Sequence, residues 1–344
     1  AYDALTQSLY TGDNIGLPSF DLEVNRLRFF GGTTNHWAGH CRPLDSIDFA
    51  QRDWVEHSGW PIGRTELDPY YERSQAIVGL GPYQYEDLDF WQDKIQLPEI
   101  QPDPLRLKTA VYNQSPPTRF GPSYQEELEQ AANVAVYLHA NVLEIQTNDT
   151  AARVTGLKLG CIEGPELSIS ARIYILATGG MENARLMLLS NSLVTAGLGN
   201  DHGLVGRFFQ DHLLLRPGAD ISLSDPQIDL SLYHSIHKVH DSQMFAILAS
   251  PEALLRRERI NNFRFHLVRT RAHYAKSMGR VFSKIDGPNT RRAAMIDSRG
   301  RERDSIALHL VLEPTPNPDS RITLSDKTDL FGQRKLAVNW QTVD

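Results

Sequence analysis

The pattern of apolar and polar positions along the chain predicts a mixture of helices and strands. Residues 61–79 have helical spacing, in which Thr65 is placed to cap the N-terminus, Pro69 to lie in the first turn and Gly79 to end the helix. Residues 122–134 have helical spacing again, with one face rich in glutamate. Two helices are therefore expected in the first half of the chain.

A region with strand character follows. The runs 134–148, 153–164 and 167–180 are rich in β-branched residues and partly alternate between apolar and polar positions. The last run holds an almost wholly apolar stretch, Ile173 to Ala177, which is typical of a strand buried on both faces. It ends at Thr178-Gly179-Gly180, and the residues that follow predict a helix. A strand, a glycine turn and a helix start together favour an anionic or polar ligand.

The remaining segments predict irregular structure first and then a region rich in strands. Residues 82–118 are rich in proline and aromatic residues, which predicts irregular structure. Beyond about residue 215, strands are predicted near 243–249, 262–270 and 305–312, and two more strands follow before the last residues. This part of the chain is expected to form a domain rich in sheet.

Composition narrows the class of protein. A chain of 344 residues suits about two domains. The formal net charge of −7 argues against a nucleic-acid surface. Cys41 and Cys161 form neither a disulfide framework nor a Cys-x-x-Cys metal site. No apolar run approaches the roughly 20 residues that span a bilayer. We therefore expect a soluble protein, with cytoplasm and periplasm both open.

One short run carries unusual chemistry. FGGTTNHWAGHCRP, residues 30–43, combines two glycines, two threonines, an asparagine, a histidine and a tryptophan. Glycines let a ligand approach the backbone closely, and hydroxyl, imidazole and indole groups stand beside them. A surface turn would also explain the run, but a loop around a flat, phosphorylated cofactor explains more of it.

A metal site is the other chemistry that the sequence raises. His234, His237 and His240 are spaced three apart with Asp241 next to the last. Metal ligands need convergent geometry as well as spacing, so we predict no metal here. The sequence also has no Gly-x-Ser-x-Gly run and no Walker A run, which disfavours a hydrolase triad and phosphoryl transfer.

Five ordered runs together resemble the glucose–methanol–choline (GMC) oxidoreductases. They are FGGTTNHWAGHCRPL, SGWPIGRTELDPYYERSQAIVGLG, YILATGGMENARLMLLSN, VGRFFQDHL, and PNPDSRITLSD followed by LFGQRKLAVNW. The chain is most similar to the sugar-oxidising branch, which includes pyranose oxidase and the fructose, gluconate and glycoside 3-dehydrogenases. The resemblance implies an FAD-dependent enzyme that oxidises a CH–OH group of a sugar or glycoside, with hydride passing to flavin N5.

The resemblance also implies a fold of the mixed α/β (α+β) class. It implies a Rossmann-like FAD-binding domain, incomplete here, and a substrate domain built on a large, mostly antiparallel sheet. On this basis residues 1–60 are a partial FAD-binding segment with the flavin loop, and 61–120 are a cap or irregular insertion. Residues 121–215 continue the FAD-binding domain, and 216–344 form the substrate-binding domain.

The cofactor-binding residues are carried over from the matching runs. They are Gly31, Gly32, Thr33, Thr34, Asn35, His36, Trp37, Val142, Ala177, Thr178, Gly179, Asn183 and Asp211. In pyranose oxidase the histidine of the similar run is joined covalently to the flavin, and His36 is the residue that could do this here. A neutral imidazole is a suitable nucleophile. Covalent and non-covalent FAD both stay open.

Two family features are not found in the sequence. It contains no Gly-x-Gly-x-x-Gly run in a strand–helix setting, which would hold the FAD pyrophosphate. The catalytic histidine pair of the family is expected beyond Asp344, so the catalytic residues stay unknown and the chain reads as a piece of a longer enzyme. The alternatives are a non-catalytic structural or accessory subunit, and a GMC oxidase of a sterol or aliphatic alcohol. Assembly as a homo-oligomer stays open.

Overall fold

The computed structural model describes residues 3–17, 21–222, 228–269 and 305–343. It is 25% helix and 26% strand, which confirms the predicted mixed α+β class. The chain forms two compact units. Unit 1 comprises Ala1–Trp37, Thr118–Asp211 and Thr315–Asp344, and unit 2 comprises Ala38–Pro117 and His212–Pro314. The FAD-binding, cap and substrate-binding roles given to 1–60, 61–120, 121–215 and 216–344 stay predictions.

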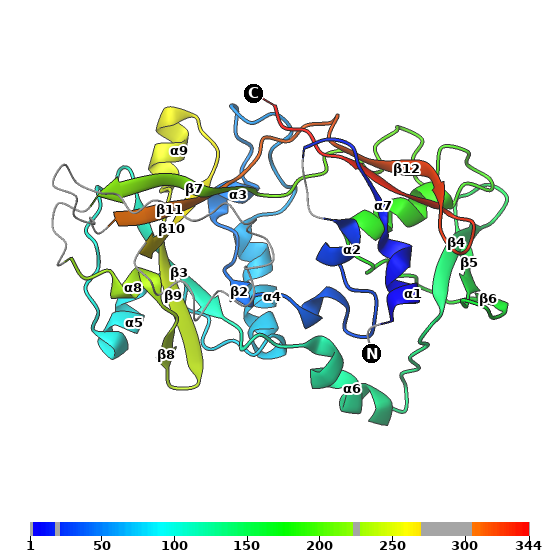
Figure 1. The fold of residues 1–344 in the computed structure, drawn as a ribbon, viewed down its shortest axis with the longest axis horizontal. Helices are drawn as coiled ribbons and strands as arrows, with labels where there is room; N and C mark the ends of the chain where they lie inside the picture. Colours follow the sequence, from blue (N-terminus) through cyan, green and yellow to red (C-terminus); the bar gives the residue numbers. More distant parts are fainter. Residues whose placement is uncertain (1–2, 18–20, 223–227, 270–304, 344) are drawn as a thin grey trace, which may run out of the picture. The chain divides into compact units, whose positions relative to one another are not determined.

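Unit 1 contains two small sheets (Figure 1). In one, β1 pairs in parallel with β13, and β13 pairs antiparallel with β12; in the other, β4, β5 and β6 form an antiparallel meander. The strands are β1 (Gly12–Asn14), β4 (Asn141–Thr147), β5 (Val154–Gly160), β6 (Glu166–Ile169), β12 (Arg321–Thr328) and β13 (Arg334–Asn339). The helices are α1 (Ala4–Gln7), η1 (Ser8–Tyr10), α2 (Leu22–Asn25), η2 (Gly32–Asn35), α6 (Phe120–Gln130) and α7 (Gly180–Leu189).

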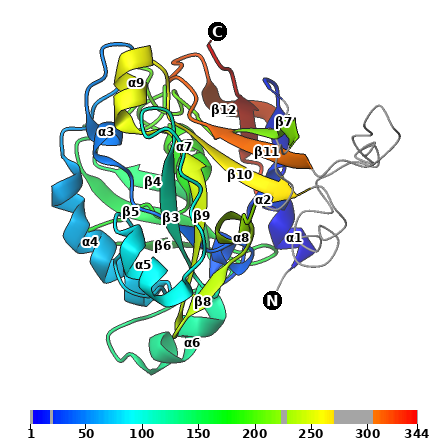
Figure 2. The ribbon, with the colours of Figure 1, turned by 90° about the vertical axis from the view of Figure 1, so that its left-hand side faces the viewer.

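Unit 2 is built on a seven-stranded antiparallel sheet. Its order is β2-β3-β9-β10-β11-β7, with β8 added beside β9, and the strands succeed one another in Figure 2. They are β2 (His40–Cys41), β3 (Lys108–Gln114), β7 (Leu213–Ser222), β8 (His237–Val239), β9 (Ser242–Ala249), β10 (Phe263–Arg269) and β11 (Ser305–Leu312). The helices are α3 (Ser46–Phe49), α4 (Arg64–Ile77), α5 (Leu88–Ile95), α8 (Ser231–His234) and α9 (Glu252–Glu258). A large antiparallel sheet was predicted and is present.

The two faces of this sheet differ because side chains alternate along each strand. One face presents Ala246, Leu248, Leu267 and Ile306, which pack with Leu232 and Tyr233 of α8 in a buried cluster. Further along the same face, Trp91 of α5 is fully buried against Val111 and Met244. The opposite face carries Tyr112, Phe245, Arg264 and His266 instead. The larger core of unit 2 therefore lies on one side of the sheet, and the other side combines polar groups with a smaller buried cluster of Ala110, Phe245 and Ile247.

The predicted helix over 61–79 is present as α4, but its start differs. Gly63 is the N-cap, and its amide donates to the Glu66 carboxylate. Thr65 is therefore inside the helix and not its cap. Pro69 lies in the second turn, where its missing N–H and ring disturb the bond to the carbonyl four residues earlier. Gly79 follows the helix with φ of 65°, as a helix-ending glycine does.

The prediction of irregular structure over 82–118 is wrong for two stretches. Asp87 caps α5 by accepting a hydrogen bond from the amide of Phe90. Residues 108–114 form β3, which pairs with β9 over six residues. The proline and aromatic content of this segment obscured the periodicity of both stretches.

Two stretches that were predicted as strand form none. Residues 134–140 and 171–179 lie outside all ladders of the described chain, and their apolar side chains are exposed. Ile173 is 79% exposed and Ile175 is 83% exposed, so the prediction of a strand buried on both faces is wrong for Ile173 to Ala177. A strand requires a hydrogen-bonded neighbour, and no described strand pairs with this one. Within the described chain, no helix is long and apolar enough to cross a membrane.

Candidate functional site

The glycine loop is shaped by positive φ angles at two positions in unit 1. Gly31 has φ of 86° and Gly32 has φ of 52°. A Cβ on Gly31 would lie 2.4 Å from the backbone nitrogen of Gly121 in α6, so this glycine is required by packing. A Cβ on Gly32 would meet only the Leu27 carbonyl oxygen, at 3.9 Å. The backbone at Gly32 is therefore open to a ligand, whereas the backbone at Gly31 is covered.

Most polar groups of this loop hold the loop itself. The Thr34 hydroxyl donates to the Gly31 carbonyl and accepts from the Phe120 amide. Asn35 Nδ2 donates to the carbonyls of Phe30, at 3.1 Å, and Gly32, at 2.9 Å. These side chains, predicted as cofactor contacts, have structural partners in this fold.

The far end of the loop is fixed to the segment before α6. Trp37 Nε1 donates to the Thr118 carbonyl at 2.8 Å. Arg119 Nη1 donates to the carbonyls of Thr34, at 3.0 Å, and Trp37, at 2.9 Å. Trp37 therefore anchors the loop, and a ligand would meet it only at its half-exposed indole face.

Thr33 and His36 are the exposed members of the loop. The His36 Nε2 atom lies 3.2 Å from the Asn25 carbonyl oxygen, which can only accept. In the neutral ring this contact places the proton on Nε2 and the lone pair on Nδ1. His36 thus offers an accessible nucleophilic nitrogen, which a covalent link to flavin would need.

The start of α7 forms the second candidate region. Thr178 donates to Asn183 Oδ1 from both its amide and its hydroxyl, and Asn183 Nδ2 donates to the Leu176 carbonyl. Gly179 is the N-cap, with φ of 89°, and an added Cβ would meet no atom within 4 Å there or at Gly180. The free N–H groups of a helix start favour an anionic ligand.

A chain of largely buried charges ties these two regions together. Arg26, just before the glycine loop, pairs with Glu182 of α7 at 2.6 Å. Arg185 reaches Glu182 at 3.5 Å and Asp329 at 2.7 Å. Arg26 also lies over the Tyr10 ring, 4.3 Å from its centre. The structure therefore links the loop to the α7 start through neighbouring residues.

A second link joins the loop to β4. Arg28 Nη2 donates to Asn141 Oδ1 at 2.9 Å, next to the predicted site residue Val142. The buried Gln7 holds the backbone between these arginines, since it donates to the Arg26 carbonyl and accepts from the Arg28 amide. Val142 itself is half-buried, and it is its neighbour Asn141 that makes the contact with Arg28.

The remaining predicted residues lie apart from these links. Ala177 is exposed in the segment that was expected to be a strand, and Asp211 is exposed in the irregular segment before β7. Among the described residues, no group of three or more histidine, cysteine, aspartate or glutamate side chains is placed to hold a metal. His234 ends α8, His237 begins β8 and His240 has φ of 53° in the turn that follows.

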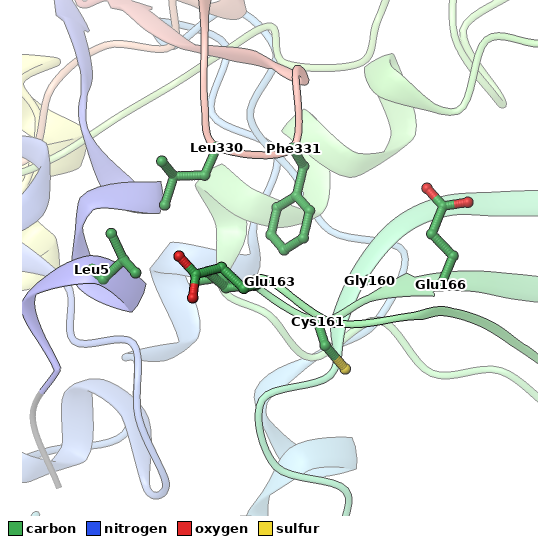
Figure 3. A pocket seen from close by; sticks show the side chains of 9 residues that line it. Leu5, Gly160, Cys161, Glu163, Glu166, Leu330 and Phe331 are labelled. Carbon is green, nitrogen blue, oxygen red and sulfur yellow. The ribbon is translucent and has the colours of Figure 1, made fainter.

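Unit 1 also has a cavity of about 400 Å³ at another place (Figure 3). Leu5, Leu330 and Phe331 approach Glu163 there, and the free thiol of Cys161 belongs to the same lining. The predicted cofactor residues do not line it. This cavity therefore does not support the prediction that the glycine loop binds flavin.

Unit 2 has a cavity of about 500 Å³ on the polar face of its sheet, which the sequence did not predict. Its lining includes Asp48, Trp60, Tyr112, Arg264 and Glu313. Burial raises the pKa of the Asp48 carboxyl, and the nearby Asp45 and Glu313 add to this. A signal was present in FRFHLV, residues 263–268, where two basic residues alternate with apolar ones along a predicted strand.

Comparison with known proteins gives a partial similarity to a dehydrogenase. No family model matches the chain. A 2-methyl-1,2-propanediol dehydrogenase from Mycolicibacterium austroafricanum is 26% identical over 227 residues, covering 54% of this chain. The chain spans about 40% of the length of that dehydrogenase.

The buried charge chain predicts that neutralising Glu182 lowers the stability of unit 1. In Glu182→Gln, the Arg26 guanidinium loses its charged partner, and unit 1 should lose about 3 kcal/mol of stability. The exposed pair of Lys158 and Glu166 provides the control, since Glu166→Gln should change stability by less than about 0.5 kcal/mol. Urea unfolding with hydrogen exchange at α7 measures both. Equal shifts in the two variants would contradict the structural role of Glu182.

The pH dependence of stability should report on His266. Burial, and then the nearby Arg264, His40, His309 and Arg216, lower its pKa from 6.5 to about 3 in the folded chain. Between those values the unfolded chain binds the extra proton, so stability is full above pH 6.5 and is lost as pH falls toward 3. His266→Gln should flatten this decline, as measured by urea midpoints across that range. An unchanged slope would show that the ring is hydrated and not desolvated.

Proposed function

We propose that this chain serves in an FAD-dependent oxidoreductase that oxidises a CH–OH group of a sugar or glycoside, with hydride passing to flavin N5. One finding supports an oxidoreductase that acts on an alcohol. The curated relative is named a dehydrogenase of a diol. The observation that carries the proposal is the Arg26–Glu182 pair, which joins the glycine loop to the open N-terminus of α7.

The residues present fit a dinucleotide. Gly32, Gly179 and Gly180 each leave backbone bare where a side chain would otherwise stand. Helix α7 has ten residues, and its first N–H groups suit a phosphate oxygen. Glu182 would repel such a group, but its carboxylate is engaged by Arg26 and Arg185. The charge near the helix start is thereby balanced.

We assign different tasks to the predicted residues. Gly32, Thr33 and His36 would contact FAD directly, because they are open or exposed. Residues with structural partners would position the loop or the turn before α7; they are Gly31, Thr34, Asn35, Trp37, Thr178 and Asn183. Bound FAD would supply the hydride acceptor. No residue of the chain is assigned as the general base.

A small aliphatic alcohol is the second candidate substrate. The relative's name specifies 2-methyl-1,2-propanediol, a short diol that needs no sugar-sized site. The sugar reading depends on the run NHW at residues 35–37, which resembles the sugar-oxidising branch. Both candidates require the same removal of hydride from a carbon that carries a hydroxyl group.

Flavin binding can be tested at the open glycine. In the full-length protein, Gly32→Ala should weaken FAD binding at least tenfold, about 1.4 kcal/mol, because its methyl group would enter the ligand's space. Gly203→Ala is the matched control, since Gly203 also has positive φ (66°) and open surroundings in unit 1. Titration followed by flavin absorbance measures both variants. No bound flavin in the parent protein, even with added FAD, would refute the proposal.

The same preparation decides how FAD is held. After acid precipitation, colour that stays with the polypeptide and is lost in His36→Ala shows a covalent bond. Colour in the supernatant shows non-covalent binding and leaves FAD dependence unchanged.

A substrate panel with a dye acceptor separates the candidate functions. We expect glucose and methyl glucosides to reduce the dye faster than 2-methyl-1,2-propanediol. The reverse order would assign the aliphatic alcohol. Bound flavin without reduction by any alcohol would instead favour a non-catalytic subunit.

A further inference from the structure

The cavity of unit 2 contains a cation, Arg264, for which the described residues supply no counter-ion. Arg264 lies on the polar face of the sheet and lines this cavity. Its Nη1 donates to the Tyr112 hydroxyl, while its Nε is buried and has no hydrogen-bond partner. Among the described residues, no carboxylate lies within 4 Å of its guanidinium. An arginine fork with unused donors matches a carboxylate.

The histidines beside Arg264 add no charge of either sign, because burial lowers the pKa of His266 and of His40. His266 lies two residues along β10 from Arg264 and opposite His309 of β11. Phe245 stacks on Tyr112 and packs against His40, with ring centres 5.3 and 4.7 Å apart. The basic neighbours that lower the pKa of His266 include Arg264 itself. Arg264 is therefore the cation that this end of the cavity offers to a ligand.

Two carboxylates of the cavity, Glu313 and Asp45, do not neutralise Arg264, because each pairs with other cations. Glu313 forms a two-point pair with Arg52, at 2.6 and 2.9 Å. Asp45 pairs with Arg42 and Lys108, both at 2.8 Å. These two acids are thus balanced by cations of their own.

The other end of the cavity suits hydroxyl groups. Asp48 accepts from the Asp45 amide at 2.8 Å and from Asn262 Nδ2 at 3.3 Å, and no cation pairs with it among the described residues. Trp60 is 57% exposed beside Phe49 and offers an apolar ring surface. Free lone pairs with an aromatic surface are suited to a hydroxylated carbon chain.

We propose that this cavity binds a small hydroxylated carboxylate, whose carboxylate pairs with Arg264 and whose hydroxyls bond Asp48 and Asn262. The cavity volume, about 500 Å³, is within the usual range for small-molecule sites. The proposal concerns binding alone and stands whether or not unit 1 holds FAD. Charge, and not size, would then select the ligand.

The test compares two probes that differ only at one carbon. D-Glucuronate carries a carboxylate where D-glucose carries a CH2OH group. Calorimetry on the full-length protein should show glucuronate binding at least tenfold tighter than glucose, about 1.4 kcal/mol. Added salt should weaken glucuronate binding more than glucose binding. Equal affinities for the two probes, or no glucuronate binding, would overturn the proposal.

Variants locate the site. Arg264→Met keeps the aliphatic stem and should abolish the preference for glucuronate, whereas Arg264→Lys should keep part of it. Arg257→Gln is the control, since Arg257 is exposed on α9 and pairs with Glu258. Preference that survives in Arg264→Met would place the ligand elsewhere.

A further measurement needs no variant and covers the case in which Arg264→Met does not fold. Phenylglyoxal modifies accessible arginines, and mass spectrometry reports each site. Glucuronate should protect Arg264 and leave Arg257 reactive, whereas glucose should protect neither. Lack of protection at Arg264 would contradict the proposal.

Discussion

A chain of four charges holds the candidate cofactor region together. Arg26, Glu182, Arg185 and Asp329 come from three distant parts of the sequence and pair within unit 1. Removing such groups from water is costly, so each must keep its partner. The segment before the glycine loop is therefore fixed to α7, and α7 to the turn between β12 and β13.

The alternation of side chains organises unit 2 in a similar way. One face of its sheet is apolar and packs with α5 and α8 around Trp91, Leu232 and Leu248. Because successive residues point to opposite faces, burying that face commits Arg264 and His266 to the other. There the acids Asp45 and Glu313 have cationic partners, whereas no carboxylate of the described residues pairs with Arg264. The same strand pattern thus builds a core and leaves a charge available.

The predicted cofactor residues divide into two kinds in the structure. The hydrogen bonds of Thr34, Asn35 and Trp37 hold the loop in place, whereas Thr33 and His36 are exposed. A sequence motif includes both kinds of residue, because the residues that hold the loop also position the exposed ones. Rigid loops that expose a few groups are a common way to position a cofactor.

The sequence by itself determined the local elements: α4, α7 and β9 to β13 follow from apolar spacing and from glycine punctuation. It did not determine the pairing of 171–179, which has strand composition but no described neighbour, nor β3, whose partner β9 lies far along the chain. The unit 2 cavity and the Arg26–Glu182 pair were equally invisible. Spacing along a chain encodes backbone preference, but burial and charge balance depend on contacts between distant residues, which only the tertiary structure fixes.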